Sequence, residues 1–388
     1  MKKICVVTGS RAEYGLMSRM MHLIKDDTDL QLQIIATNMH LSVKYGETYK
    51  EIEADGFVID KKVPILSSSE DTANAISKSV GVGISGFADA YQEICPDMII
   101  VLGDRYEILA AVSAALFFKI PVTHLHGGEI TEGAYDDAIR HAVTKMSHLH
   151  FTSTEKYRRR IIQMGENPDT VYYVGALGCD NIRHSLLMSK EELEKSLNFR
   201  LDRNTIHVAF HPVTMEDDTA ETQFRELLSA IDFFDKLRII FTMPNSDTNG
   251  RIIMILIKEY VKKNPEKAIW FTSLGMIRHL SLMKYIGAVV GNSSSGIIEA
   301  PSFNIPTLNI GDRQKGRIAA SSVINCLPVK EDIIEKLKII VNHDYEGRSK
   351  EGINPYDKPN TAQEIVKTIK KEINISVVKK FYDFAWKN

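Results

Sequence analysis

Short apolar runs alternate with longer amphipathic segments along the first half of the chain. The apolar runs predict strands near 3–8, 32–37, 57–60, 97–102, 121–125, 148–152 and 171–174. The amphipathic segments predict helices near 14–26, 42–55, 70–94, 105–118, 136–147 and 154–164. Because parallel strands need a crossover connection, this alternation predicts a doubly wound parallel sheet.

A second series of the same kind follows a polar, charged stretch near 188–204. It predicts strands near 206–210, 238–242, 268–272, 287–291, 306–310 and 322–325, and helices near 219–235, 249–263, 275–285, 296–302 and 330–342. Two Rossmann-like α/β domains, residues 1–180 and 181–365, are the simplest interpretation, with the active site in the cleft between the domains. The tail is predicted to be helical at 361–373 and again at 377–386, where aromatic side chains indicate packing: Phe381, Tyr382, Phe384 and Trp386.

Composition limits the class of protein. A chain of 388 residues is too long for one core, which agrees with two domains. Its 25% of charged residues is ordinary for a globular protein, and a formal charge of −2 gives no electrostatic reason to expect nucleic acid or a membrane as a partner. The four cysteines lack metal or redox spacing. The apolar run Ile4–Val7 is too short for a signal peptide and the run 108–118 is too short to cross a bilayer, so we expect a cytoplasmic protein.

Ionisable side chains gather where predicted strands of the first domain end. The carboxyl groups of Asp104, Glu129 and Asp136 and the imidazole of His126 all follow strands or begin the next helix. Ligands of open α/β sheets bind outside the carboxyl ends of the strands, so these groups are candidates for proton transfer. His211 follows a strand of the second domain and is a further candidate acid or base.

A metal site is the alternative for the same segment. His124, His126, Glu129 and Asp136 are residue types that bind metals. The chain has neither a His-x-x-x-His nor a His-Glu-x-x-His spacing there, and we therefore expect no metal.

Three loops indicate binding of an anionic group. Arg11 stands where the first helix begins, which suits an anion, although a capped helix start with a surface arginine is the alternative. In the second domain a strand is followed by hydroxyls at a helix start, Ser293, Ser294 and Ser295 before Gly296, with Glu299 about one turn into the helix. Phosphate and ribose binding is one interpretation of this loop, and helix capping is the other.

The third loop, Gly311–Arg317, adds cations on a glycine-rich segment, among them Arg313 and Arg317. Together the loops predict a diphosphate clamp.

The first loop, around Arg11, matches neither of two common nucleotide-binding motifs. It lacks both the three glycines of the dinucleotide fingerprint and the Lys-Ser/Thr ending of a Walker loop.

Seven motifs in this order resemble the hydrolysing UDP-N-acetylglucosamine 2-epimerases of bacterial sialic-acid synthesis: Gly9–Gly15, Gly103–Glu107, His124–Glu129, Ile139–His141, His211-Pro212, Gly291–Gly296 and Gly311–Arg317. The resemblance covers roughly residues 1–365. It implies a two-domain GT-B fold whose C-terminal helix, 366–388, packs back on the first domain. It also implies a homodimer or a dimer of dimers, and conversion of UDP-N-acetylglucosamine and water to N-acetylmannosamine and UDP without metal or nicotinamide cofactor.

The resemblance also implies residue roles. A base removes the proton at carbon 2 while UDP leaves carbon 1, and water then adds to the 2-acetamidoglucal. Asp104, Glu129 and Asp136 would be the acids and bases, Arg140 would orient one carboxylate, and His211 would lie near the departing diphosphate. The remaining roles concern UDP. In the serine loop, residues 293–296, Ser293 and Ser294 would hold the β-phosphate together with Arg313. Glu299 would hold the ribose, and Asn245 would face the uracil.

Three questions stay open at this point. Non-hydrolysing relatives carry a catalytic glutamate where this chain has His126, so the division of roles among His126, Glu129 and Asp136 is undecided. The substrate is a second question, since a GDP- or UDP-linked 4-acetamido sugar of legionaminic-acid synthesis would fit the same clamp. A GT-B glycosyltransferase and a nucleotide-sugar sensor without catalysis are the alternatives of other classes.

Overall fold

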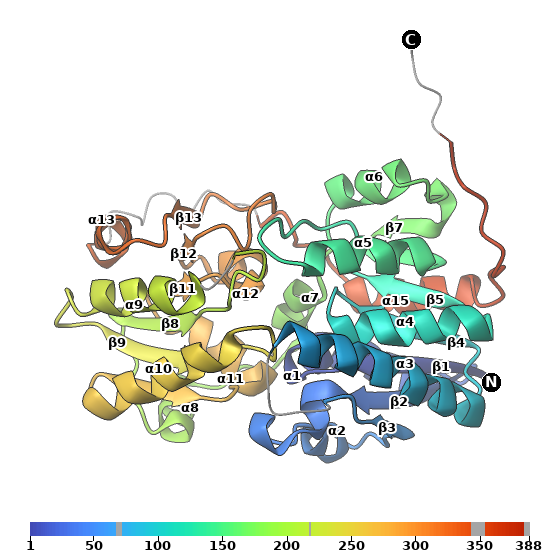
Figure 1. Cartoon of the computed structure of the whole chain (residues 1–388), viewed down its shortest axis with the longest axis horizontal. Helices are drawn as coiled ribbons and strands as arrows, with labels where there is room; N and C mark the ends of the chain where they lie inside the picture. The colour runs from blue at the N-terminus through green and yellow to red at the C-terminus, as the bar shows by residue number, and fades with distance from the viewer. Residues whose placement is uncertain (67–71, 217–218, 343–353, 384–388) are drawn as a thin grey trace, which may run out of the picture. The chain divides into compact units, whose positions relative to one another are not determined.

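The computed structural model describes residues 1–66, 72–216, 219–342 and 354–383. The chain forms two compact units (Figure 1). Unit 1 comprises Met1–Glu129, Asp136–Asn181 and Lys358–Asn388, and unit 2 comprises Ile130–Tyr135 and Ile182–Asp357.

Unit 1 contains a seven-stranded sheet in the order β3-β2-β1-β4-β5-β6-β7, with all pairs parallel. Its strands are β1 (Lys2–Thr8), β2 (Leu30–Thr37), β3 (Lys61–Val63), β4 (Met98–Leu102), β5 (Val122–Leu125), β6 (Leu149–Thr152) and β7 (Val171–Tyr173). Its helices are α1 (Arg11–Lys25), α2 (Tyr49–Ala54), α3 (Ala73–Ile94), α4 (Tyr106–Phe118), α5 (Asp136–Met146), α6 (Glu155–Gln163) and α15 (Thr361–Lys371), with 3-10 turns η1 (Asn38–Leu41), η2 (Val43–Tyr45) and η3 (Pro168–Thr170).

Helices cover both faces of this sheet (Figure 1). Apolar side chains of α1 and α15 pack on one face, and those of α3 and α4 pack on the other. Every residue of β4 is therefore buried, which explains its uninterrupted apolar sequence. Strand order reverses between β1 and β4, and this is the switch point at which ligands of such sheets bind.

Unit 2 repeats the arrangement with a six-stranded parallel sheet in the order β10-β9-β8-β11-β12-β13. Its strands are β8 (Thr205–Ala209), β9 (Arg238–Thr242), β10 (Ala268–Phe271), β11 (Ala288–Gly291), β12 (Thr307–Ile310) and β13 (Val323–Cys326). Its helices are α8 (Lys190–Leu197), α9 (Thr219–Ile231), α10 (Gly250–Lys263), α11 (Gly275–Met283), α12 (Ser294–Ile298) and α13 (Lys330–Val341), with the 3-10 turn η4 (Ala300–Phe303). The linking helix α7 (Leu177–His184) begins in unit 1 and ends in unit 2.

The two doubly wound parallel sheets confirm the predicted fold class. The unit limits differ from the expected 1–180 and 181–365, because Ile130–Tyr135 belongs to unit 2 and the chain from Lys358 belongs to unit 1. Hydrogen bonds within unit 2 explain the first difference: the N–H of Glu132 donates to the carbonyl of Lys315, and the N–H of Met215 to that of Gly133.

Two early elements were predicted wrongly. The strand expected at 57–60 begins only at residue 61. Phe57 is buried in the core beside α1, and Asp60 bonds to the middle of β2, where its carboxylate accepts from the N–H of Ile34 and its own N–H donates to the Ile34 carbonyl. The helix expected at 42–55 is broken by Gly46 at φ +88°, which leaves η2 and the short α2. Residues 70 and 71 of the helix expected at 70–94 lie outside the described residues.

The stretch after β7 contains two helices that were not predicted, α7 and α8. Helix α8 carries a capping box between Ser189 and Glu192 and buries Leu193 and Leu197, so a helical signal was present in this polar segment. Helix α12 is shorter than predicted and ends at Ile298.

The C-terminal tail is the largest correction. Residues 377–383 are not helical, and Phe381 is 67% exposed instead of buried. The tail nevertheless contacts unit 1: the ammonium group of Lys379 lies 2.7 Å from a carboxylate oxygen of buried Glu166 and donates to the carbonyl of Lys145, and the N–H of Tyr382 donates to the carbonyl of Gly165. Phe384 and Trp386 lie outside the described residues.

Replacement of Lys379 by alanine is expected to lower the free energy of unfolding by about 1.5–3 kcal/mol, because the carboxylate of Glu166 loses a charged donor. Urea denaturation measures the change, with Lys380→Ala at the exposed neighbouring position as the control. Equal stability of the two variants would contradict docking of the tail through Lys379.

No helix in the described part of the chain is long and apolar enough to span a bilayer.

Candidate active site

Asp104 and Arg140 form an ion pair at the carboxyl end of the unit 1 sheet. Asp104 follows β4, and Arg140 lies in α5 with its side chain almost completely buried. Arg140 also donates to the carbonyl of Glu129 at 3.0 Å and to a carboxylate oxygen of Asp137 at 3.2 Å. The guanidinium group therefore holds Asp104 in place and joins it to the backbone at Glu129.

Glu129 lies in a second polar cluster, after β5. Its Oε1 accepts from the hydroxyl of Ser153 at 2.6 Å and lies 3.2 Å from Nδ1 of His126. The Nε2 atom of His126 accepts from the N–H of Leu177 at 3.5 Å, which leaves Nδ1–H to donate to Glu129. Ser153 was not predicted, and its only signal is its position directly after β6.

His126 has a left-handed backbone, with φ +62°. This backbone conformation is energetically unfavourable for a residue with a β-carbon, and such strain is found preferentially at functional sites. The strained turn aims the ring at the Glu129 carboxylate.

His124 connects the two segments that carry the Asp104–Arg140 pair. Its Nε2–H donates to the carbonyl of Gly103 at 2.7 Å, and its Nδ1 accepts from the hydroxyl of Thr144 in α5 at 3.1 Å. Burial lowers the pKa of His124 to about 3, so the ring is neutral and keeps this donor and acceptor arrangement at neutral pH. His124 is a support for the site, a role that the motif alone did not reveal.

The other predicted residues of unit 1 lie at helix starts. Asp136 is buried at the first residue of α5. Arg11 begins α1 and forms an ion pair with Glu51 of α2.

In unit 2, buried Asn292 holds His211. The amide of Asn292 accepts from the N–H of His211 at 2.7 Å and donates to its carbonyl at 2.8 Å. The N–H of Asn245 donates to Nδ1 of His211 at 3.5 Å, which places the proton of the neutral ring on Nε2. Asn292 stands inside a motif noted from the sequence, but its bonding to His211 requires the paired strands β8 and β11.

Two residues of the third predicted loop contact the same asparagine. Arg313 and Gln314 both donate to the carbonyl of Asn292, at 3.2 and 2.8 Å. Arg317 donates to the carbonyl of Ile130, a residue of the segment that joins unit 2. The third loop therefore lies against the serine loop that begins after Asn292.

The serine loop is organised by His279, which was not predicted. Ser293 caps α12, and the Nε2 atom of His279 lies 3.0 Å from the hydroxyl of Ser295 and 3.5 Å from a carboxylate oxygen of Glu299. Gly296 packs against Thr307, where a side chain would not fit. Glu299 caps the end of α12 instead of lying within the helix as predicted.

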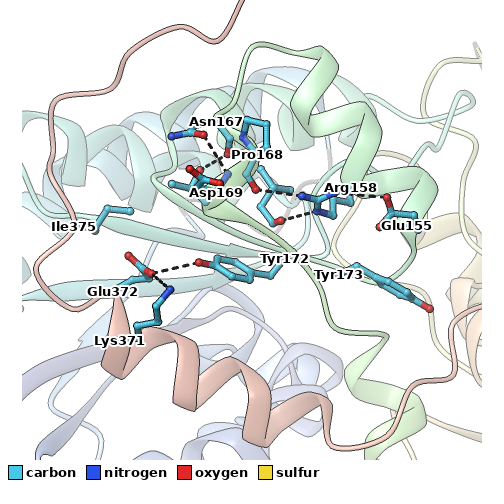
Figure 2. A pocket seen from close by; sticks show the side chains of 12 residues that line it. Glu155, Arg158, Asn167, Pro168, Asp169, Tyr172, Tyr173, Lys371, Glu372 and Ile375 are labelled. Carbon is cyan, nitrogen blue, oxygen red and sulfur yellow. Dashed lines mark hydrogen bonds and ion pairs between the residues drawn. The ribbon is translucent and has the colours of Figure 1, made fainter.

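A hollow of about 760 Å³ elsewhere in unit 1 does not include any predicted site residue (Figure 2). It lies beside β7 and the end of α15, and its polar groups bind one another: Arg158 donates to the carbonyl of Val171, and the hydroxyl of Tyr172 to Glu372. Figure 2 shows these bonds as dashed lines across the lining. We do not regard this hollow as the active site.

Comparison with known proteins identifies the family. A family model described as UDP-N-acetylglucosamine 2-epimerase matches residues 22–370. The chain belongs to the UDP-N-acetylglucosamine 2-epimerase family. The solved structure of Methanocaldococcus jannaschii UDP-GlcNAc 2-epimerase in complex with UDP-GlcNAc and UDP has a TM-score of 0.80 and 19% identity, and it covers 95% of this chain and 99% of that one. This likeness shows the fold.

The sequences of two relatives align with this epimerase over almost the whole length of both chains. The Campylobacter jejuni protein named GDP/UDP-N,N'-diacetylbacillosamine 2-epimerase (hydrolyzing) is 41% identical over 384 residues, which are 98% of this chain and 99% of that protein. The Escherichia coli polysialic acid biosynthesis protein P7 is 40% identical over 385 residues, which are 99% of this chain and 97% of that protein. The chain is thus an enzyme, a nucleotide-sugar 2-epimerase.

Proposed function

We propose that the chain is a hydrolysing UDP-N-acetylglucosamine 2-epimerase, which converts UDP-N-acetylglucosamine and water to N-acetylmannosamine and UDP for sialic-acid synthesis. The observation that carries the proposal is the pair of restrained carboxyl groups at adjacent strand ends, Asp104 with Arg140 and Glu129 with Ser153 and His126. Groups held in this way suit proton transfer at one carbon atom. The relatives support the class of reaction, since the C. jejuni protein is named as hydrolyzing.

Residues of unit 1 carry out the proton transfers of both the elimination and the hydration step. Asp104, Glu129 and Asp136 are the acids and bases: one carboxylate removes the proton from carbon 2 as the bond between carbon 1 and UDP breaks, which gives 2-acetamidoglucal. Water then adds across the double bond, with a proton to the opposite face of carbon 2 and hydroxyl to carbon 1. His126 and Arg140 position Glu129 and Asp104.

Unit 2 would take the leaving group. Arg313 and Arg317, with Arg11 of unit 1, would bind the diphosphate, and hydroxyls of Ser293, Ser294 and Ser295 would donate to its oxygens. His211 would lie near the phosphate that departs, and its Nε2–H is a donor for the charge that develops on UDP. Glu299 would bind the ribose and Asn245 the uracil.

A second substrate class has a specific observation in its favour. The C. jejuni relative is named for a GDP- or UDP-linked diacetylbacillosamine, while the E. coli relative, nearly as similar, is named for polysialic acid. We place UDP-N-acetylglucosamine first and the 4-acetamido sugar second. The restrained acid–base residues favour either over a glycosyltransferase.

Incubation with UDP-N-acetylglucosamine is expected to release free N-acetylmannosamine and UDP, because the motifs resemble the hydrolysing branch. NMR of the products measures this outcome, and parallel reactions with UDP- and GDP-linked diacetylbacillosamine compare kcat/KM. An equilibrium mixture of two UDP-sugars without free hexosamine would refute hydrolysis. A larger kcat/KM for the diacetylated sugar would assign the second substrate.

The homodimer or dimer of dimers stays a prediction. Helices α3 and α4 present exposed apolar side chains that such an interface would cover, namely Val82, Leu116, Phe117 and Phe118.

A further inference from the structure

Two buried glutamates face one arginine at the switch point of the unit 1 sheet. Glu13 lies in the first turn of α1, after β1, and Glu107 lies in the first turn of α4, after β4. Arg105 immediately precedes α4. The exposed fractions are 5% for Glu13, 0% for Glu107 and 8% for Arg105. None of the roles proposed above uses these three side chains.

The two carboxyl groups compete for the same donor. The Nε–H of Arg105 donates to Oε1 of Glu107 at 2.8 Å, and the same nitrogen lies 3.7 Å from Oε1 of Glu13. The other oxygen of Glu13 accepts from the N–H of Gly9 at 2.8 Å. Oε1 of Glu13 and Oε2 of Glu107 are buried oxygens with no hydrogen-bond partner among the described residues.

Gly9 is required for this close approach. A β-carbon at Gly9 would lie 2.3 Å from Oε1 of Glu107, so any larger residue would displace that carboxylate. The loop after β1 and the segment after β4 are thus packed directly on each other at the switch point.

Charge balance requires a proton in this cluster. Two ionised glutamates beside one guanidinium would leave a net negative charge in a buried site, which is unfavourable unless one carboxyl group stays protonated. Glu107 makes the charge-assisted hydrogen bond to Arg105, so Glu13 is the group that keeps the proton.

The surroundings of Glu13 agree with this assignment. Burial and then the neighbouring Glu107 raise the pKa of Glu13 to about 8, while Arg105, the Gly9 N–H and the Ser10 hydroxyl act in the opposite direction. His40 of η1 packs against the same loop, with its Nε2 3.1 Å from the Thr8 hydroxyl, and burial lowers its pKa to about 4. His40 is therefore neutral near pH 7.

We propose that Glu13 and Glu107 are positioning residues that hold Arg105 at the switch point of the unit 1 sheet, and that a proton on Glu13 keeps the cluster neutral for an anionic nucleotide-sugar. The proposal rests on the proposed function for the identity of that ligand. When Glu13 ionises, the cluster gains a negative charge at the switch point, where ligands of such sheets bind, and repels the diphosphate sugar. Ionisation of Glu13 should therefore raise KM more than it lowers kcat.

The test uses Glu13→Gln, which has the shape of a protonated glutamate and cannot ionise. The ratio of kcat/KM at pH 7 to that at pH 9 is measured with UDP-N-acetylglucosamine. We expect about a tenfold fall in the unmodified enzyme, because one proton is lost, and a nearly flat profile in Glu13→Gln. Glu364→Gln, an exposed first-turn glutamate of α15, is the matched control and should keep the fall.

Thermal denaturation tests the proton without relying on activity. Since the pKa of Glu13 is raised in the folded state, its contribution to stability is present below about pH 4.5 and is lost as the pH rises toward 8. The Tm of Glu13→Gln should therefore rise relative to the unmodified protein between pH 5 and 8, and then stay constant. Parallel Tm curves of the two proteins would overturn the assignment of a proton to Glu13. A shifted Tm curve with an unaltered kcat/KM ratio would overturn its role in binding, and absence of turnover with a shifted curve would count against the proposed function alone.

Discussion

Asp104→Asn, Glu129→Gln and Asp136→Asn are each expected to lower turnover by about a hundredfold or more, the scale of general acid–base groups. The amide side chains keep the size of the acids but cannot act as acids or bases near neutral pH. Asp104 and Glu129 are held by Arg140 and by Ser153 with His126, so substitution removes a fixed proton carrier without opening space. Affinity for UDP should barely change, because the proposed UDP residues lie mainly in unit 2.

Steady-state kinetics and calorimetry of UDP binding measure the two quantities separately. Glu155→Gln is the control, since Glu155 is a partly exposed glutamate of α6 that pairs with Arg158 and Arg159. Reaction in deuterium oxide should place one deuterium at carbon 2 of the product. Near-normal rates in all three amide variants would contradict the proposed role of the segment from Asp104 to Arg140, and retention of the original hydrogen would contradict proton removal at carbon 2.

The second large effect concerns the diphosphate. Arg313→Ala is expected to weaken UDP binding by about 1.5–3 kcal/mol, the scale of a charge-assisted hydrogen bond, and Ser294→Ala by less. Arg313 is anchored at the carbonyl of Asn292, directly before the serines. This anchoring holds the guanidinium group beside the loop that would bind the same phosphate.

Lys315→Ala provides a matched control from the same loop, because Lys315 is exposed and pairs with Asp312. Its UDP affinity should stay close to that of the unmodified enzyme, which separates a specific contact from general positive charge. Equal affinities in the Arg313, Ser294 and Lys315 variants would mean that the diphosphate binds elsewhere.

The fold was predictable because its central strands are buried on both faces. A strand such as Met98–Leu102 must be apolar throughout, and the helices between such strands must carry one apolar face, so both patterns can be read without coordinates. Prediction failed where long-range contacts decide the conformation. Phe57 looked like a strand residue but fills the core beside α1, and the tail at 377–383 looked amphipathic but is held by polar contacts of Lys379 and Tyr382.

For the candidate site, the sequence indicated which segments carry chemistry but not how their side chains are paired. Strand ends pointed to Asp104, Glu129 and His211. Ser153, Asn292 and His279 could not be assigned as partners from local sequence, since each lies far along the chain from the residue it holds.

The sequence by itself determined the two α/β units, the positions of the strand ends and the family to which the motifs belong, because local periodicity and motif order depend on neighbouring residues alone. Only the tertiary structure decided that Arg140 holds Asp104 and that His124 joins Gly103 to Thr144. It also showed that Glu13 and Glu107 compete for Arg105. Parallel strands bring together segments that lie far apart in the chain, and burial then sets the charge that those segments can carry.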